Sequence, residues 1–306
     1  MDITSSFECP LCESKNVIKW GGDYKHSRAD IAGVEESLYT LGGYQIRKCV
    51  LCDLLFKTPV LTQLQVSEYY EASTADQWGD GDFSFARRAD VFEQKVLNFG
   101  GYGRVLDVGC SNGAMLASWG TRWDKYGAEL SPIAATRAVE RGIKIIDIEK
   151  GEEGFSEYFD VITVVDVIEH IPNPREFIGR LLKLLKPNGV MLWYTGDHST
   201  PFWKFEKGGY WYCDIPEHVC FYSLESLAFV ESHFSLKLLL HERYTHTRDR
   251  RRLFRLIQQL FKNAAFMVFS GWRKIFGLNF GIKRSTYPNF ASARDHMLVV
   301  FSKKSS

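Results

Sequence analysis

The sequence has no surplus of charge of either sign, no export signal and no long apolar run. Its 38 Lys and Arg residues balance 37 Asp and Glu residues, so the net charge of +1 gives no overall attraction to nucleic acid or membrane. The N-terminal stretch MDITSSFECP lacks the basic and apolar regions of a secretory signal, and no run of 18 uncharged apolar residues could form a spanning helix. We therefore expect a cytoplasmic, globular protein.

The cysteines are unevenly distributed along the chain. Four of the seven form two C-x-x-C pairs, Cys9 with Cys12 and Cys49 with Cys52, with 36 residues between the pairs. In a chain without an export signal this pattern favours a metal over disulfides. Four thiolates leave no open coordination position, so we predict a structural zinc ion in a ribbon-like module over residues 1–58.

From residue 103 onward, apolar runs alternate with helical patterns. Strands are expected at 104–109, 125–130, 143–147, 158–165, 189–195, 235–244 and 295–304, and helices at 113–120, 131–141, 174–186 and 223–234. This alternation predicts an α/β fold with a doubly wound, mostly parallel, seven-stranded sheet. Residues 59–102 are predicted to be a helical connector or cofactor lid, and residues 103–306 the main domain, with an insertion at about 245–294.

The stretch RVLDVGCSNGAML (104–116) indicates a strand that feeds a glycine-containing loop and then a helix. It lacks two glycines of the G-x-G-x-x-G pattern of nicotinamide sites and instead fits D-x-G-x-x-x-G, with Asp107, Gly109 and Gly113. Glu129 follows the next predicted strand, where a carboxylate can accept both hydroxyls of a ribose. The alternative is a glycine turn that closes a strand-to-helix joint without a ligand.

The stretches LDVGCSNGAML, GAELSP, FDVITVVDVIEHIPNP and LLKPNGVMLWYT resemble, in order and spacing, the class I S-adenosylmethionine-dependent methyltransferases. The resemblance implies a Rossmann-like fold and S-adenosylmethionine as the cofactor. It implies that Glu129 holds the ribose, and that Ser111 stands where the family more often has glycine. The implied cofactor-binding residues are Asp107, Gly109, Cys110, Ser111, Asn112, Gly113, Glu129, Leu130, Ser131, Asp147, Ile148, Asp166 and Val167.

Two Glu-His dipeptides are candidates for the base that takes a proton from the acceptor. Glu169-His170 follows the fourth predicted strand, and in the resembling family such a histidine often forms a wall of the cofactor pocket. Glu217-His218 precedes the helix at 223–234, where the chain is expected to cover the acceptor. A histidine beside an acid is suited to accept a hydroxyl proton, although His218 could instead pack under the loop or cap Ser223.

The four-cysteine module, the EYY stretch and the second Glu-His dipeptide together resemble deoxysugar C-methyltransferases. In that group a tyrosine, a glutamate and a histidine surround a nucleotide-sugar, which implies a catalytic role for Tyr70 or its neighbour Tyr69. The stretch KCVLCDLLFKTP resembles the ribbons fused to such enzymes, with Asp53 in place of a glycine and therefore expected at positive φ. The aromatic segment 200–214 is expected to be a lid with a hinge at Gly208-Gly209.

Residues 248–284 carry ten Lys and Arg residues against one acid, together with apolar residues at helical spacing. A basic amphipathic helix predicts peripheral contact with an anionic membrane surface, and the alternative is a helical cap with solvated charges. We predict from the sequence that the chain transfers methyl groups to oxygen or carbon of a small, sugar-like or lipid-linked acceptor. The alternatives are an RNA base methyltransferase that uses the ribbon and the basic segment, and a non-catalytic cofactor-binding scaffold.

Overall fold

The computed structural model describes residues 7–24, 43–59, 88–148, 154–215, 217–245, 261 and 294–304. Within them a central sheet has seven strands in the order β10-β11-β8-β7-β4-β5-β6. The bounds are β4 Arg104–Val108, β5 Asp124–Ala128, β6 Lys144–Ile145, β7 Phe159–Val165, β8 Leu185–Gly196, β10 Leu236–Tyr244 and β11 His296–Lys303. Neighbours from β8 to β6 are parallel, and β11 runs antiparallel to β8 and to β10, which confirms the predicted doubly wound sheet.

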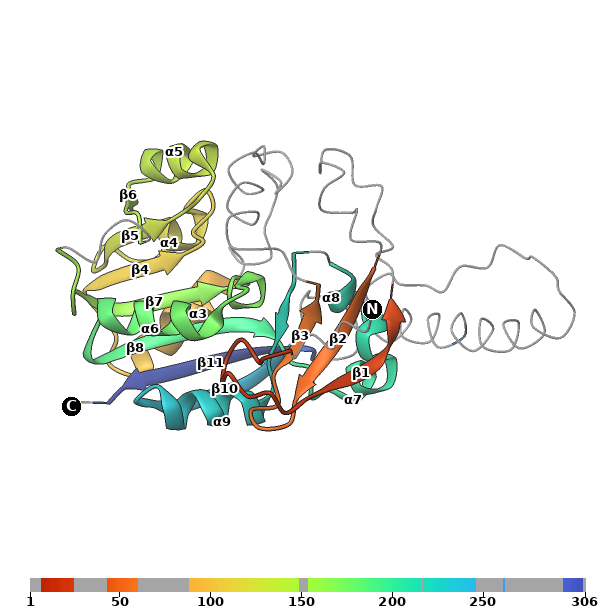
Figure 1. The fold of residues 1–306 in the computed structure, drawn as a ribbon. Coiled ribbons are helices and arrows are strands. Elements are labelled where there is room, and N and C mark those ends of the chain that lie inside the picture. Colours follow the sequence, from red (N-terminus) through yellow and green to blue (C-terminus); the bar gives the residue numbers. More distant parts are fainter. Residues whose placement is uncertain are drawn as a thin grey trace, which may run out of the picture.

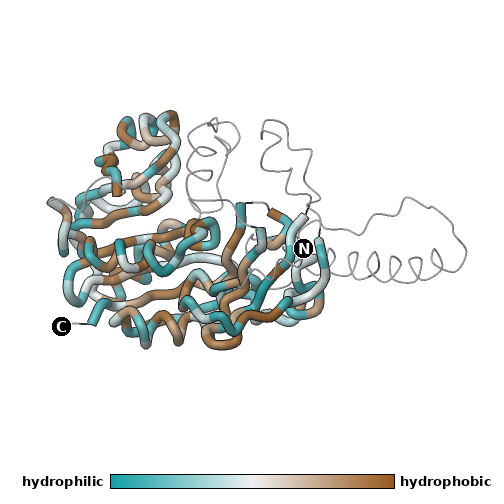
Figure 2. Tube along the Cα trace, in the orientation of Figure 1, coloured by the Kyte–Doolittle hydropathy of each residue, from teal (hydrophilic) through white to brown (hydrophobic). Residues whose placement is uncertain are grey.

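Helices cover both faces of this sheet because successive strand residues point to opposite sides. Met191 and Trp193 of β8 face α6 and α9, whereas Leu192 and Tyr194 face α3 and α4. The helices are α3 Ala89–Asn98, α4 Ala114–Ser118, α5 Pro132–Glu140, α6 Pro174–Leu184 and α9 Leu224–His233. The central strands are largely apolar (Figure 2), as their burial on both faces requires.

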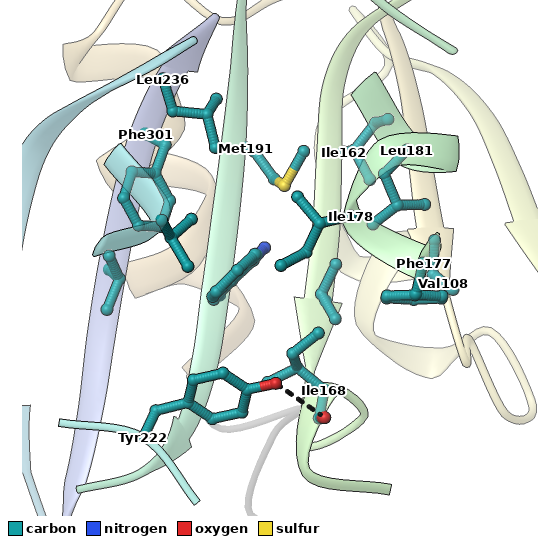
Figure 3. Packing of buried hydrophobic residues seen from close by; sticks show 14 of the residues in the cluster. Val108, Ile162, Ile168, Phe177, Ile178, Leu181, Met191, Tyr222, Leu236 and Phe301 are labelled. Carbon is teal, nitrogen blue, oxygen red and sulfur yellow. Dashed lines mark hydrogen bonds between the residues drawn. The ribbon is translucent and has the colours of Figure 1, made fainter. Parts of the chain in front are cut away.

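The α6 side of the core is packed tightly (Figure 3). Phe177, Ile178 and Leu181 of α6 lie against Ile162 of β7 and against β8. The helix begins at Pro174, with the Asn173 side chain accepting a hydrogen bond from the Glu176 amide, and it ends two residues before the predicted boundary. On the same side, the Tyr222 hydroxyl donates to the Ile168 carbonyl over 3.5 Å, which ties the chain after β7 to the segment before α9.

A second, four-stranded sheet has the order β1-β2-β3-β9, with β1 Val17–Tyr24, β2 Tyr44–Cys49, β3 Leu55–Thr58 and β9 Cys220–Phe221. Its first three strands belong to the predicted ribbon, but β9 comes from the main domain and pairs with β3. The small sheet lies at the opposite end of the molecule from α5 and β6 (Figure 1). The ribbon is therefore joined to the main domain by main-chain hydrogen bonds as well as by side chains.

Candidate functional site

The loop after β4 adopts the strained backbone that its glycines allow. Gly109 and Gly113 have φ of 72° and 75°, and Ser111 has φ of 48°, so the serine takes a conformation that favours glycine. A Cβ atom on Gly109 would lie 2.5 Å from Val167 Cγ2, which means that only glycine fits between β4 and β7. The Gly109 amide donates to the Ala128 carbonyl over 2.8 Å and holds the loop across the carboxyl ends of β4 and β5.

Glu129 lies directly after β5 and is held against this loop. Its Oε2 accepts a hydrogen bond from the Ser111 amide and its Oε1 from the Ser131 amide, both over 2.8 Å. Burial raises the pKa of Glu129, and these main-chain donors oppose that shift by stabilising the charged form. Each carboxylate oxygen keeps a second lone pair, so the group can still accept from ribose hydroxyls, as the sequence predicts.

Asp107, in β4, is turned toward the neighbouring strand. Its Oδ1 accepts from the Thr163 hydroxyl of β7 over 2.7 Å, and the residue is 4% exposed. Burial raises the pKa of Asp107 to about 7, even though the hydrogen bond from Thr163 lowers it. This carboxyl group therefore joins two strands beneath the glycine loop.

Three further predicted cofactor residues use their side chains to build the loop and its flanking helices. Asn112 Oδ1 accepts from the Ala114 amide over 3.1 Å at the start of α4. The Ser131 hydroxyl accepts from the Ala134 amide as the N-cap of α5. Cys110 is buried, so these residues shape the site and leave mainly their main-chain groups for a cofactor.

The remaining predicted adenosine contacts are more open. Leu130 is 39% exposed at the start of α5. Strand β6 ends at Ile145, two residues earlier than predicted, because it is a short edge strand that pairs only with β5. Asp147 is consequently exposed and Ile148 half-buried beyond the strand end.

Asp166 marks the other end of the site, directly after β7. It has φ of 47°, its amide donates to the Tyr194 carbonyl over 2.8 Å, and Val167 behind it packs against the main core. Burial, followed by the nearby Glu169 carboxyl, raises the pKa of Asp166 well above its usual range. Its Oδ1 is buried and has no hydrogen-bond partner in the part of the chain that the structure describes.

The two predicted Glu-His dipeptides meet in space, but only three of their four side chains come together. Glu169, His170 and His218 each offer a ligand atom within 4.8 Å of the other two. Glu169 and His170 lie in η3 (Ile168–His170), and the His170 and His218 rings meet edge to face at 4.6 Å. The Val219 amide donates to the Glu169 carbonyl over 2.7 Å, which fixes the two segments together. Burial lowers the pKa of His218 well below its usual range, so the ring is neutral.

Glu217, the fourth of these residues, is half-buried and lies outside that group of ligand atoms among the described residues. It lies near Lys57 of β3, whose ammonium group donates to the Ile215 carbonyl over 2.5 Å. Burial lowers the pKa of Lys57 to about 8, although the neighbouring Cys213 and Glu217 oppose the shift. A side chain from the ribbon thus supports the segment that carries His218.

Several residues that sequence reasoning did not single out complete the site. The Tyr212 hydroxyl donates to Glu169 Oε1, and the Thr195 hydroxyl of β8 donates to Glu169 Oε2 over 2.9 Å. The main-chain carbonyl of Tyr212 accepts from His218 Nδ1 over 3.1 Å. His296, at the start of β11, packs against Tyr212 at 5.0 Å. Thr195 and His296 lie at the ends of predicted strands, and Tyr212 lies in the aromatic segment 200–214. The sequence does not show their contacts, because their partners are distant in the chain.

The segment 200–214, predicted to be a hinged lid, is packed against the ribbon, and its Tyr212 contacts Glu169 and His218. It forms α7 (Pro201–Glu206), η4 (Lys207–Gly209) and α8 (Trp211–Asp214). The Gly208 carbonyl accepts from the Tyr44 hydroxyl over 2.8 Å, and a Cβ on Gly208 would lie 2.4 Å from the Tyr24 ring. Trp203 and Tyr212 are fully buried, because aromatic side chains of this size stabilise the fold only when they are removed from water.

The four cysteines of the C-x-x-C pairs come together as predicted. Their sulfur atoms all lie within 4.8 Å of one another, with 3.5 Å between Cys9 and Cys52 and 3.4 Å between Cys12 and Cys49. These separations exceed a disulfide bond and suit four thiolates around one ion. Asp53 has φ of 59°, which confirms the expectation that it replaces a glycine in a left-handed turn.

Tyr69, Tyr70 and the basic segment 248–284, apart from Phe261, lie outside the described residues. Among the helices that the structure describes, none is long and apolar enough to cross a membrane.

Comparison with known proteins relates this chain to methyltransferases. Residues 84–232 match the family model of a methyltransferase domain. The ubiquinone biosynthesis O-methyltransferase of Erwinia tasmaniensis is 30% identical over 109 residues (33% of this chain, 45% of the relative), and that of Pasteurella multocida is 35% identical over 119 residues (33% and 49%). The chain thus spans about half the length of the curated relatives it matches.

Among solved structures, the N-methyltransferase NodS from Bradyrhizobium japonicum WM9 in complex with S-adenosyl-L-homocysteine is 15% identical, with a TM-score of 0.49. The match covers 79% of this chain and 98% of that one. The strand order of the main sheet and the position of Glu129 beside the glycine loop are both consistent with a methyltransferase domain. Residues 84–232 of the chain therefore match a methyltransferase domain, in agreement with the Rossmann-like strand order of the main sheet.

Proposed function

We propose that this protein transfers a methyl group from S-adenosylmethionine to a hydroxyl oxygen of a small, sugar-like acceptor. The observation that carries the proposal is the position of Glu129, whose carboxylate is fixed by the amides of Ser111 and Ser131 beside the glycine loop. A ribose at this place would donate both hydroxyls to Glu129. The main-chain groups from Gly109 to Gly113 would then line the methionine part of the cofactor.

The acceptor end of the site is defined by Asp166 and by the group of Glu169, His170 and His218. S-adenosylmethionine supplies, when bound, a methyl carbon on a sulfonium that is already a good leaving group. The protein has two remaining tasks: to align the acceptor oxygen with that carbon and to provide for its proton. Because His218 Nδ1 lies 3.1 Å from a carbonyl oxygen, Nδ1 carries the proton of the neutral ring and Nε2 keeps its lone pair.

The relatives favour oxygen as the methylated atom, since the curated proteins matched by this chain are named O-methyltransferases. Their ubiquinone-pathway acceptor is not transferred to this chain, because the matched region leaves half of each relative uncovered. A small polar acceptor agrees with a site whose acceptor end is built from carboxyl, imidazole and hydroxyl groups.

We also propose that the four cysteines hold a structural zinc ion. Four sulfur ligands close the coordination shell, so the ion would stabilise the ribbon without taking part in the reaction. Since β3 of the ribbon pairs with β9, two residues after His218, the ion would stabilise the acceptor side indirectly.

Calorimetric titration of the purified chain with S-adenosylmethionine, with NADH as the control, tests the cofactor. We expect binding of S-adenosylmethionine and no heat from NADH. Transfer of isotopically labelled methyl groups to a panel of sugars and diols, followed by mass analysis of the product, tests the acceptor atom. Absence of S-adenosylmethionine binding would overturn the proposed function, and label on nitrogen or carbon would overturn the choice of oxygen.

A further inference from the structure

We propose that Glu169, His170 and His218 form a second metal site, which binds a divalent first-row cation at the acceptor end. The role of this cation in binding the acceptor rests on the proposed function, whereas the site itself rests on the geometry of the three side chains. It is distinct from the four-cysteine group, with which it shares no residue.

The three side chains are close enough to share one ion. Their ligand atoms lie within 4.8 Å of one another. Ligands on one such ion stand about 2.0–2.2 Å from it and hence no more than roughly 4.4 Å apart, so the site needs only a small contraction to close on a metal. Glu169 and His170 come from one turn of 3-10 helix, and His218 reaches the same point from a segment nearly fifty residues later.

Two of the three ligands are oriented by hydrogen bonds of the kind that metal ligands require. Glu169 accepts from the hydroxyl groups of Tyr212 and Thr195, one on each carboxylate oxygen. His218 donates from Nδ1 to the Tyr212 carbonyl, which leaves the Nε2 lone pair for a metal. Tyr212 thus positions both ligands, one through its side chain and one through its main chain. Such supporting contacts fix the tautomer and orientation of a metal-binding histidine.

The burial of the three side chains and the neighbouring Asp166 are consistent with a site that a ligand can reach. Glu169 is fully buried and His218 is 6% exposed, whereas His170 is partly exposed. Asp166, three residues before Glu169, has a buried Oδ1 without a hydrogen-bond partner among the described residues. Buried polar atoms are nearly always satisfied, so this oxygen indicates that a further group belongs here when the site is occupied.

The donor set selects the kind of ion. Two imidazole nitrogens and one carboxylate suit Mn²⁺, Co²⁺ or Zn²⁺ better than Mg²⁺, which prefers oxygen ligands. Three protein ligands leave coordination positions open, in contrast to the closed four-cysteine group. Those positions could accept two neighbouring oxygen atoms, so we infer that the acceptor carries adjacent hydroxyl groups, as in a vicinal diol.

The cation would lower the pKa of the bound hydroxyl group, which then releases its proton to solvent. The oxygen lone pair forms the new carbon–oxygen bond while the sulfur–methyl bond breaks and its electron pair stays on sulfur. The products are a methyl ether, S-adenosylhomocysteine and one proton. In this reaction His218 holds the cation and is not the base.

Titration of the zinc-loaded full chain with Mn²⁺, followed by the loss of the free-ion electron paramagnetic resonance signal, tests the site directly. We expect one Mn²⁺ per chain in the wild-type protein and loss of that binding in His218→Ala. Tyr212→Phe keeps all three ligands and removes one supporting hydrogen bond, so it should weaken binding by about 10- to 100-fold. His233→Ala, which removes an exposed histidine in the last turn of α9, should bind as the wild type does.

His170→Gln serves as a second ligand variant at a partly exposed position, so the test does not depend on the folding of one buried variant. Wild-type protein that binds no Mn²⁺ or Zn²⁺ beyond the cysteine-bound ion would overturn the proposal, as would undiminished binding in both His170→Gln and His218→Ala. Methyl transfer that proceeds equally with and without the second cation would overturn its role while leaving the proposed function intact. Mn²⁺ binding by a protein that does not bind S-adenosylmethionine would overturn the proposed function while leaving the metal site intact.

Discussion

The hydroxyl group of Ser223 donates a hydrogen bond of 2.7 Å to Asp53 Oδ2, across 170 residues of sequence. Asp53 directly follows the last cysteine of the four-cysteine group, and Ser223 is the N-cap of α9. The Asp53 carbonyl also lies 3.0 Å from His198 Nε2, beyond the end of β8. The turn that closes the ribbon is thereby attached to two segments of the methyltransferase domain.

Replacement of Ser223 by alanine should lower the free energy of unfolding by about 1–3 kcal/mol, because it removes both the N-cap and the bond to Asp53. Urea unfolding would measure the change. Ser232→Ala is the matched control, since Ser232 lies on the same helix but is exposed and bonds only locally, to Phe229 and His233. Equal effects of the two substitutions would contradict the importance of the contact to Asp53.

Removal of the proposed zinc ligands should reduce methyl transfer to the acceptor more than it reduces cofactor binding. In the Cys9→Ser/Cys12→Ser variant we expect loss of zinc and a large fall in turnover, because the Lys57 amide of the ribbon donates to the Val219 carbonyl beside His218. Affinity for S-adenosylmethionine should be unchanged, since the glycine loop and Glu129 lie on the main sheet. Metal analysis and calorimetry would measure the two properties. The control is Cys213→Ser, which lies outside the four-cysteine cluster and should retain zinc. Loss of cofactor binding in the double variant would show that the ribbon also supports the cofactor site.

Glu129→Ala should weaken S-adenosylmethionine binding by about 1–3 kcal/mol, because it removes the acceptor for the ribose hydroxyls and frees two main-chain donors. Glu129→Gln should fall between this variant and the wild type, since the amide oxygen can still accept one of these bonds. Glu140→Ala, at an exposed position on α5, is the control. Calorimetry that finds the same affinity in Glu129→Ala and in the control would remove Glu129 from the cofactor site.

The stability of the protein without cofactor should depend on the protonation of Asp107. The unfolded chain loses this proton near pH 3.8, but the folded state keeps it to about pH 7 because the carboxyl is buried. Asp107 therefore makes its full contribution to the free energy of unfolding below pH 3.8. This contribution decreases as the pH rises to about 7. The loss amounts to roughly 4 kcal/mol.

Asp107→Asn keeps an oxygen for the Thr163 hydroxyl and has no proton to lose. Its stability relative to the wild type should increase between pH 4 and pH 7 and then stay constant. Denaturant unfolding at pH 4, 5.5 and 8 would measure this difference. A difference that does not vary with pH would show that Asp107 is ionised in the folded state.

The sequence alone was sufficient for the features that depend on local pattern. The apolar strands followed by helices specified the doubly wound sheet, because their periodicity decides which residues can be buried. The glycine loop, Glu129 and the four cysteines were found for a similar reason: their chemistry requires particular residue types at short, regular spacings. The two Glu-His dipeptides were recognised as dipeptides, but their pattern did not show that Glu169, His170 and His218 form one group.

Only the tertiary structure decided which of these residues meet. Tyr212 supports both Glu169 and His218, and β9 completes the ribbon sheet, through contacts between segments that lie far apart in the chain. The packing of ribbon residues such as Tyr24 onto Gly208 was likewise decided by the tertiary structure, because local composition does not reveal it. Strand periodicity determines which side chains are buried, whereas the order and register of the strands determine which buried side chains touch. The burial pattern is encoded residue by residue, whereas the contacts between buried side chains form only once the whole chain has folded.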